Sequence, residues 1–237
     1  MTTPRLHLAM RLEAGATVRL EAERAHYLVN VLRLKPGAEV RLFNVASGEW
    51  AASILEAGRH NAVLELADCL RPPASEPGPV LHFAPIRLNR MEWLVEKAVE
   101  LGASRLVPLI TRRTVVKLGK PQRLAAIATE AAEQCERLEV PEVDEPQPLK
   151  LWLEGRGEGE RIAFADERGE GPPLADVLAG KGPHDLLIGP EGGFDARERE
   201  LLLGHPAIIP VSLGPRILRA ETAALFALSC WQVAAVR

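Results

Sequence analysis

Two glycine-bearing turns near the C-terminus are the segments best suited to hold a ligand. The first turn, 189–193, follows the apolar run 186–188, and the second, 213–215, follows the apolar run 208–211. Three glycines in the first turn let the backbone approach a bound molecule and adopt positive φ without steric cost. Ligands of open α/β sheets collect beyond the carboxyl ends of the strands. The two turns therefore predict one pocket, although a single glycine turn is more often only a tight turn.

Charged residues follow the second turn, immediately before an apolar helix predicted over 223–235. They include Arg216, Arg219 and Glu221. A helix start is an electrostatically polarised place, and here it lies close to a predicted sheet edge. This arrangement indicates a polar ligand.

The two segments also carry a family resemblance. IGPEGGF at 188–194 and LGPRILRAETAALFAL at 213–228 resemble, in this order, the signature segments of the RsmE family, the ribosomal RNA uridine N3-methyltransferases of the SPOUT superfamily. The resemblance implies an S-adenosylmethionine-dependent enzyme that methylates N3 of a specific uridine in small-subunit ribosomal RNA. It implies an α/β fold, in which a small PUA-like β-barrel precedes a SPOUT-type methyltransferase domain with a parallel sheet and a trefoil knot.

The resemblance further implies that loops after three strands hold S-adenosylmethionine, mainly through backbone groups and apolar walls. The residues that it assigns to the cofactor are Ala165, Ile188, Gly189, Pro190, Glu191, Gly192, Gly193, Leu213, Gly214, Ile217, Leu218 and Thr222.

Methylation at N3 of uracil makes a chemical demand on the site. N3 carries a proton, so the site needs a base, or cationic donors that stabilise the anion spreading onto the flanking carbonyl oxygens. Arg219 is the catalytic candidate for the cation, and Glu221 is the candidate for the proton acceptor or its orienter. An equally supported alternative is that Glu221 only caps the helix. Because N3 lies on the pairing edge, the target base has to be unpaired or flipped out.

Basic residues are the candidates for RNA contact. The net charge is −3, but residues 72–120 carry eight lysines and arginines against four acidic residues. The candidates are Arg5, Arg33 and Lys35, which lie in segments similar to the family's N-terminal markers, and Arg87, Arg90, Arg112 and Arg113. For each of the first three, a solvated surface is at least as well supported. The segment 87–91, RLNRM, departs from the Lys-Gly-Asp-Arg-Met that is common in the family, which puts any role of that glycine or acid in doubt.

The elements that position these residues fall into two predicted domains. Short β-like runs separated by glycine turns predict a small barrel over 1–71, with one helix at 23–34. The proline-rich segment 72–79 predicts a linker. Strand and helix alternate through 80–237, which predicts an α/β domain.

Three local signals predict helix starts in the second domain. Asn89 is the expected cap of a helix over 90–101, and Pro121 is the expected first residue of another. Asp195 with Glu198 three residues later forms a capping signal for a third.

Several classes of protein are disfavoured. No apolar run approaches the ~18 residues of a membrane span, and the N-terminus lacks the apolar segment of a secretory signal, so we expect a cytoplasmic protein. The wide spacing of Cys69, Cys135 and Cys230 fits neither a disulfide framework nor a zinc site, and we expect no metal. The resemblance implies a homodimer, whose interface the apolar C-terminal helix, 223–236, could supply if it does not simply fill the core.

Two other functions stay open on the sequence. One is a methyltransferase with another acceptor, such as a tRNA ribose or a purine, which the N-terminal segment 26–37 disfavours because it resembles a marker of the RsmE family. The other is a non-catalytic RNA-binding module in which the glycine segments are only turns. Binding of S-adenosylmethionine distinguishes this module from an enzyme.

Overall fold

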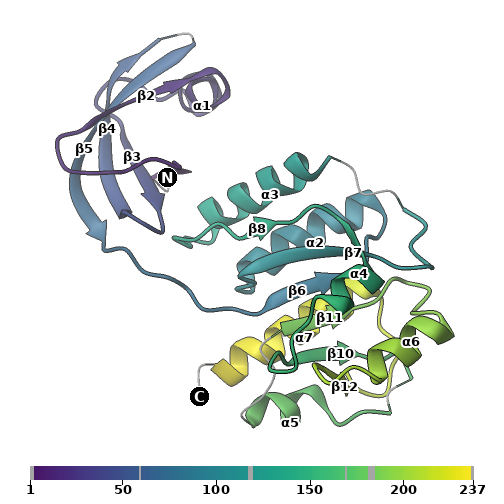
Figure 1. Ribbon diagram of the computed structural model, residues 1–237. Helices are drawn as coiled ribbons and strands as arrows, with labels where there is room; N and C mark the ends of the chain where they lie inside the picture. The colour runs from purple at the N-terminus through teal and green to yellow at the C-terminus, as the bar shows by residue number, and fades with distance from the viewer. Residues whose placement is uncertain (1–2, 59, 117–119, 169, 181–184, 236–237) are drawn as a thin grey trace. The chain divides into compact units, whose positions relative to one another are not determined.

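A computed structural model describes the chain except residues 1–2, 59, 117–119, 169, 181–184 and 236–237 (Figure 1). The chain divides into two compact units. The first comprises Met1–Glu76 and Ala132–Val140, and the second comprises Pro77–Ala131 and Pro141–Arg237. The first unit thus includes a segment that lies far along the chain from the predicted barrel.

The first unit is built on a five-stranded sheet in the order β1-β3-β4-β5-β2. Its strands are β1 (Arg5–His7), β2 (Thr17–Glu21), β3 (Glu39–Asn44), β4 (Gly48–Ala57) and β5 (Asn61–Arg71). The pairs are antiparallel except for β1 with β3. Register shifts between β4 and β5 strengthen the local twist, and the sheet curls over an apolar core (Figure 1). This curled sheet is the small β domain that the sequence predicts.

The helix predicted over 23–34 takes a different form. It is a short α-helix, α1 (Ala22–His26), followed by a π-helical turn, η1 (Tyr27–Val31). Ala25 and Leu28 are fully buried and pack this segment onto the sheet, whereas Tyr27 and Val31, two apolar positions of the predicted helix, are exposed. Arg33 then adopts a φ of 57°, which ends the helical path.

The second unit contains a parallel sheet in the order β12-β10-β11-β6-β7-β8, with β9 paired to β7. Its strands are β6 (Val80–Phe83), β7 (Arg105–Ile110), β8 (Glu142–Val143), β9 (Gln147–Pro148), β10 (Ile162–Ala165), β11 (Asp185–Ile188) and β12 (Ile208–Val211). The strands are short and mostly buried, as expected when helices cover both faces of a parallel sheet. This confirms the predicted α/β class. The trefoil knot stays a prediction.

Six helices accompany this sheet in the described chain. They are α2 (Leu88–Glu100), α3 (Pro121–Gln134), α4 (Leu149–Glu154), α5 (Leu174–Ala179), α6 (Ala196–Leu203) and α7 (Ala220–Ala235). α3 begins at Pro121 as predicted, and its last residues belong to the first unit. None of the helices in the described residues is long and apolar enough to span a membrane.

Two of the predicted helix starts differ from the structure. The cap predicted at Asn89 is wrong, because α2 begins at Leu88, two residues before its predicted start, and its N-cap is Arg87. The Asn89 side chain accepts a hydrogen bond from the Arg90 amide inside the helix. α7 begins at Ala220, three residues before its predicted start. In contrast, the capping box of Asp195 and Glu198 is present at α6, with both reciprocal hydrogen bonds formed.

Candidate cofactor and RNA site

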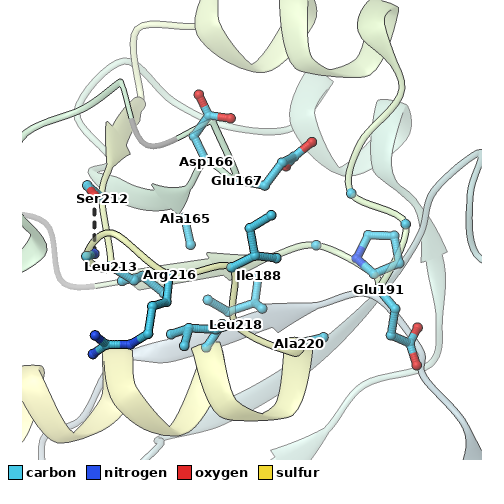
Figure 2. Close-up of a pocket in the computed structure, with 17 residues that line it drawn as sticks. Ala165, Asp166, Glu167, Ile188, Glu191, Ser212, Leu213, Arg216, Leu218 and Ala220 are labelled. Atoms are coloured by element: carbon cyan, nitrogen blue, oxygen red, sulfur yellow. Dashed lines mark hydrogen bonds between the residues drawn. The ribbon is translucent and has the colours of Figure 1, made fainter.

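A pocket of about 300 Å³ lies at the carboxyl ends of the neighbouring strands β10, β11 and β12 (Figure 2). This volume is in the range of small-molecule sites. The lining residues are Ala165, Asp166, Glu167, Ile188, Gly189, Pro190, Glu191, Gly192, Gly193, Ser212, Leu213, Gly214, Arg216, Ile217, Leu218, Ala220 and Ala223. The two glycine-bearing turns of the sequence therefore converge on one cavity.

Every residue predicted to hold the cofactor lines this pocket except Thr222, which is exposed in the first turn of α7. Six lining residues lie outside that prediction: Asp166, Glu167, Ser212, Arg216, Ala220 and Ala223. The first two directly follow β10, so the rule that ligands collect at strand ends could have found them.

Close packing fixes the turn that follows β11. A side chain at Gly189 would place its Cβ 2.5 Å from the ring of Phe194, which is buried and packs edge-on against Phe164 at 5.2 Å between ring centroids. Gly193 adopts a φ of 65°, which favours glycine. The Nη1 atom of Arg113 donates to the Gly192 carbonyl at 2.6 Å. The turn is therefore held both from inside the protein and from its surface.

The loop after β10 carries a buried carboxylate that is already paired. Arg199 donates to both oxygens of Asp166, with Nε 3.0 Å from Oδ1 and Nη2 2.6 Å from Oδ2. Burial raises the pKa of Asp166, but the hydrogen bonds and charge of Arg199, together with the Arg168 amide, outweigh it and hold this pKa below its usual value. The pKa of Arg199 is raised in turn by Asp166. Asp166 therefore anchors α6 to this loop as an ionised group.

Charged side chains of both signs line the pocket, with Glu191 among the acidic ones. Figure 2 shows Glu167 beside Asp166 on one side of Ile188 and Arg216 on the other. Both Glu167 and Arg216 are exposed. Between them the lining is apolar, with Ile188, Leu213 and Leu218 among it. A ligand with an apolar middle part and charges of both signs suits this arrangement.

The two catalytic candidates flank the first residue of α7. Arg219 is exposed and directly precedes the helix, whereas Glu221 is buried in its first turn. Neither lines the pocket, but Ala220 between them does. The Nη1 atom of Arg90 lies 3.2 Å from Oε1 of Glu221. Oε2 of Glu221 is buried and has no hydrogen-bond partner among the described residues.

An unpaired oxygen on a buried carboxylate is costly, so it calls for a proton or a donor from outside the chain. The site thus has a free acceptor at the start of α7. The sequence suggested Arg90 and Glu221 for different roles, RNA contact and catalysis, and the structure joins them in one ion pair.

The prediction that Arg5 contacts RNA is wrong. Its guanidinium is buried, lies 4.0 Å from the centroid of the Phe43 ring and donates to Glu49 Oε2 at 3.0 Å. It also donates to the carbonyl oxygens of Ala132, Glu133 and Arg137. The residue therefore holds the first unit together and is closed to a phosphate.

The other basic candidates remain accessible. Arg33 and Lys35 are exposed in the first unit, and Arg87, Arg112 and Arg113 are exposed in the second, where Arg90 is half-buried. Within the described residues, no group of three or more histidine, cysteine or acidic side chains could hold a metal ion.

Comparison with protein families gives two matches. Residues 76–232 match the model of an RNA methyltransferase domain, and residues 20–67 match that of an RNA methyltransferase PUA domain. The chain is 32% identical over 228 residues to the ribosomal RNA small subunit methyltransferase E of Rickettsia conorii, covering 95% of this chain and 93% of that protein. It is 30% identical over 233 residues to the protein of the same name from Bacillus subtilis, covering 92% and 91%.

Solved structures with the same architecture are bound to a methyl donor. A methyltransferase from Legionella pneumophila in complex with the cofactor SAM has a TM-score of 0.88 and 32% identity, covering 99% of this chain and 98% of that one. The ribosomal RNA small subunit methyltransferase E of Neisseria gonorrhoeae, bound to S-adenosyl methionine, has a TM-score of 0.86 and 29% identity, covering 98% of each chain.

Proposed function

This chain belongs to the family of ribosomal RNA small subunit methyltransferase E, and we propose that it transfers a methyl group from S-adenosylmethionine to N3 of one uridine in small-subunit ribosomal RNA. The observation that carries this proposal is the pocket at the ends of β10, β11 and β12, where both glycine turns meet. Relatives of similar length and fold bind the same donor.

The residues of the pocket fit S-adenosylmethionine by their chemistry. Apolar side chains such as Ile188, Leu213 and Leu218 suit the adenine ring, and the glycine turns offer backbone groups at close range. Glu167 and Arg216 provide one charge of each sign for the ammonium and carboxylate of the amino acid part. When bound, the cofactor supplies a methyl group on a sulfonium, which is an excellent leaving group, so the main task of the protein is alignment.

The acceptor side needs a group that takes the N3 proton. Glu221 is our candidate, because its Oε2 is the unpaired atom while Arg90 occupies Oε1. The proton moves from N3 to this carboxylate, and N3 then forms its bond to the methyl carbon. Arg219, exposed beside it, stabilises the negative charge on the uracil carbonyl oxygens.

Exposed arginines and lysines supply the RNA contacts in this proposal. Arg87, Arg112 and Arg113 serve the methyltransferase unit, and Arg33 and Lys35 serve the PUA-like unit. Contacts of this kind to phosphates make RNA binding weaken with added salt.

We also infer that the protein is cytoplasmic, because its proposed substrate is ribosomal RNA. We further infer a homodimer, because α7 leaves Phe226 and Val233 about half exposed, at 45% and 59%. An interface on α7 would cover these side chains. Sedimentation equilibrium with Phe226→Glu tests this, because the charge should shift the protein toward monomer.

Primer extension tests the reaction in cells. Ribosomal RNA from a strain that lacks the gene should lose one reverse-transcription stop at a small-subunit uridine, and plasmid-borne wild type should restore it. An unchanged stop pattern rejects the assignment.

Calorimetry separates an enzyme from a simple RNA-binding module. Wild type should bind S-adenosylmethionine, and a folded Gly192→Arg variant, which puts a long charged side chain on a residue that lines the pocket, should not.

A further inference from the structure

A second cavity of about 350 Å³ lies between α4 and α6, on residues that do not line the first pocket. Its apolar wall consists of Leu149 and Leu153 from α4 and Leu201 from α6. The first two are buried, whereas Leu201 is 51% exposed. Such a leucine surface at a cavity mouth gains from being covered, because burying apolar area is favourable.

Three exposed cations surround this apolar wall: Arg112, Lys150 and Arg197. Lys150 lies 3.8 Å from Glu154 in an exposed pair, which contributes little. Arg197 has no ion-pair partner among the described residues. The lining thus holds three cations against one carboxylate, Glu198, and Arg112 and Lys150 each have a further acidic neighbour in Asp195 and Glu154.

The single acidic residue of the lining is already engaged. Oε1 of Glu198 accepts the Arg112 amide at 2.8 Å, and Oε2 accepts the Asp195 amide at 3.3 Å. Both of its oxygens thus serve the turn before α6, and its charge offsets one of the three cations. An anion is the ligand that these charges favour.

The turn at 112–113 connects this cavity with the first pocket. Arg112 lines the cavity and places its Nε 3.0 Å from Oδ2 of Asp195. Arg113, the next residue, donates to the carbonyl of Gly192, which lines the first pocket. A molecule in the cavity therefore lies against a turn whose next residue, Arg113, holds the glycine turn of the proposed cofactor site.

We propose that this cavity binds one unpaired nucleotide of the RNA substrate, with its base against the leucines and its neighbouring phosphates on the cations. The inference rests on the proposed function, which supplies the RNA. Proteins that bind unpaired nucleotides stack the splayed-out base on aromatic side chains, arginine planes or apolar side chains, and they neutralise the backbone with arginine and lysine. A wholly apolar ligand would leave Arg197 without an ion-pair partner among the described residues, and so would a nucleobase without phosphates.

Two substitutions separate the apolar wall from the charged rim. Leu201→Asp places a carboxylate on the wall, and Leu203→Asp, on the same helix, 39% exposed and outside the cavity, is the matched control. We expect Leu201→Asp to raise the Kd for small-subunit RNA roughly tenfold. The control should leave it unchanged, and both should keep wild-type affinity for S-adenosylmethionine, which also shows that they fold.

Arg197→Ala tests the rim through the salt dependence of RNA binding. Removing one phosphate contact should reduce the slope of log K against log salt by about 0.7 for a single strand. The same change at an exposed arginine away from the cavity, Arg161→Ala, is the control.

The outcomes distinguish the two proposals. If Leu201→Asp and Arg197→Ala bind RNA like wild type while wild type transfers methyl groups, this inference is overturned and the proposed function stands. If wild type binds RNA but transfers nothing to it, the proposed function fails, and the binding series still decides the role of the cavity. If the variants bind naked RNA normally but lose activity only on the assembled subunit, the occupant is a protein and the RNA inference is overturned.

Discussion

The guanidinium of Arg90 and the carboxylate of Glu221 form an ion pair, with 3.2 Å between Nη1 and Oε1, that joins the first turn of α2 to the first turn of α7. The Arg90 side chain is 32% exposed and that of Glu221 is 10% exposed. The pair therefore reaches from the surface into the protein, beside Ala220 of the pocket. It leaves Oε2 of Glu221 buried and without a hydrogen-bond partner among the described residues.

Glu221→Gln should lower kcat roughly 10²-fold or more if the carboxylate takes the N3 proton. The residual rate should rise with pH, because uridine then loses its proton to the solvent. A residue that only stabilises the start of the helix would leave kcat and its pH profile unchanged. Steady-state kinetics from pH 6.5 to 9.5 tests this, with the melting temperature as a check on folding.

Arg90→Gln should lower kcat about tenfold while the affinity for S-adenosylmethionine stays at the wild-type level, because the glutamate then loses the group that orients it. Arg90→Lys should restore part of the rate, since it keeps the charge. A loss of RNA affinity at constant kcat would instead make Arg90 an RNA contact.

Arg219→Ala should cause a large loss of turnover, on the order of 10²-fold, with the cofactor affinity roughly kept. The reason is that Arg219 is exposed beside the pocket and does not line it. Calorimetry for the cofactor and single-turnover methyl transfer measure the two quantities. If turnover and cofactor affinity fall equally, Arg219 contributes to cofactor binding and not to the chemical step.

Gly189→Ala should reduce cofactor binding and lower the free energy of unfolding by about 1–3 kcal/mol, because its Cβ would overlap the buried ring of Phe194. Gly192→Ala is the matched control in the same turn. Its Cβ would lie 3.6 Å from Arg113 Cδ, which is an ordinary contact, so stability should stay near wild type. Equal stabilities of the two variants in urea denaturation would contradict the packing that we describe.

His82 should make the stability of the protein sensitive to pH. Burial lowers the pKa of His82, and Asp185, whose Oδ2 lies 3.8 Å away, only partly opposes this. The unfolded chain therefore binds more protons on this residue, so the stability is fully present above about pH 6.5 and falls as the pH drops below it.

For His82 the effect at pH 5.5 reaches at most about 1.4 kcal/mol relative to pH 7.5. His82→Gln should remove this part of the pH dependence, while the charged groups that face His82, Arg156, Glu160 and Asp185, are present in both proteins. If urea denaturation shows the same change in the free energy of unfolding between the two pH values for wild type and for the variant, this role of His82 is contradicted.

Features that are local in the chain could be predicted from the sequence. The apolar runs that end in glycine turns predicted β11, β12 and most of the pocket lining, because a strand and the turn that ends it are formed by adjacent residues. The capping box of Asp195 and Glu198 is equally local. Such features can be predicted from the sequence because the residues that interact lie within a few positions of one another.

Features that depend on distant partners could not be predicted. Arg5 looks like a surface residue beside a short strand, but its partners are Glu49 and carbonyl groups between 132 and 137. The Arg90–Glu221 pair spans more than half of the second unit in sequence. Only the tertiary fold brings such groups together, and nothing in the sequence around either residue identifies its partner.

A structure of the protein with S-adenosylmethionine bound tests the central claim most directly. The account predicts the cofactor in the pocket between the loops after β10, β11 and β12, in contact with Ile188, Gly189 and Leu218, with its methyl group directed toward the start of α7. A cofactor bound elsewhere, or a methyl group that faces away from Glu221, would contradict it.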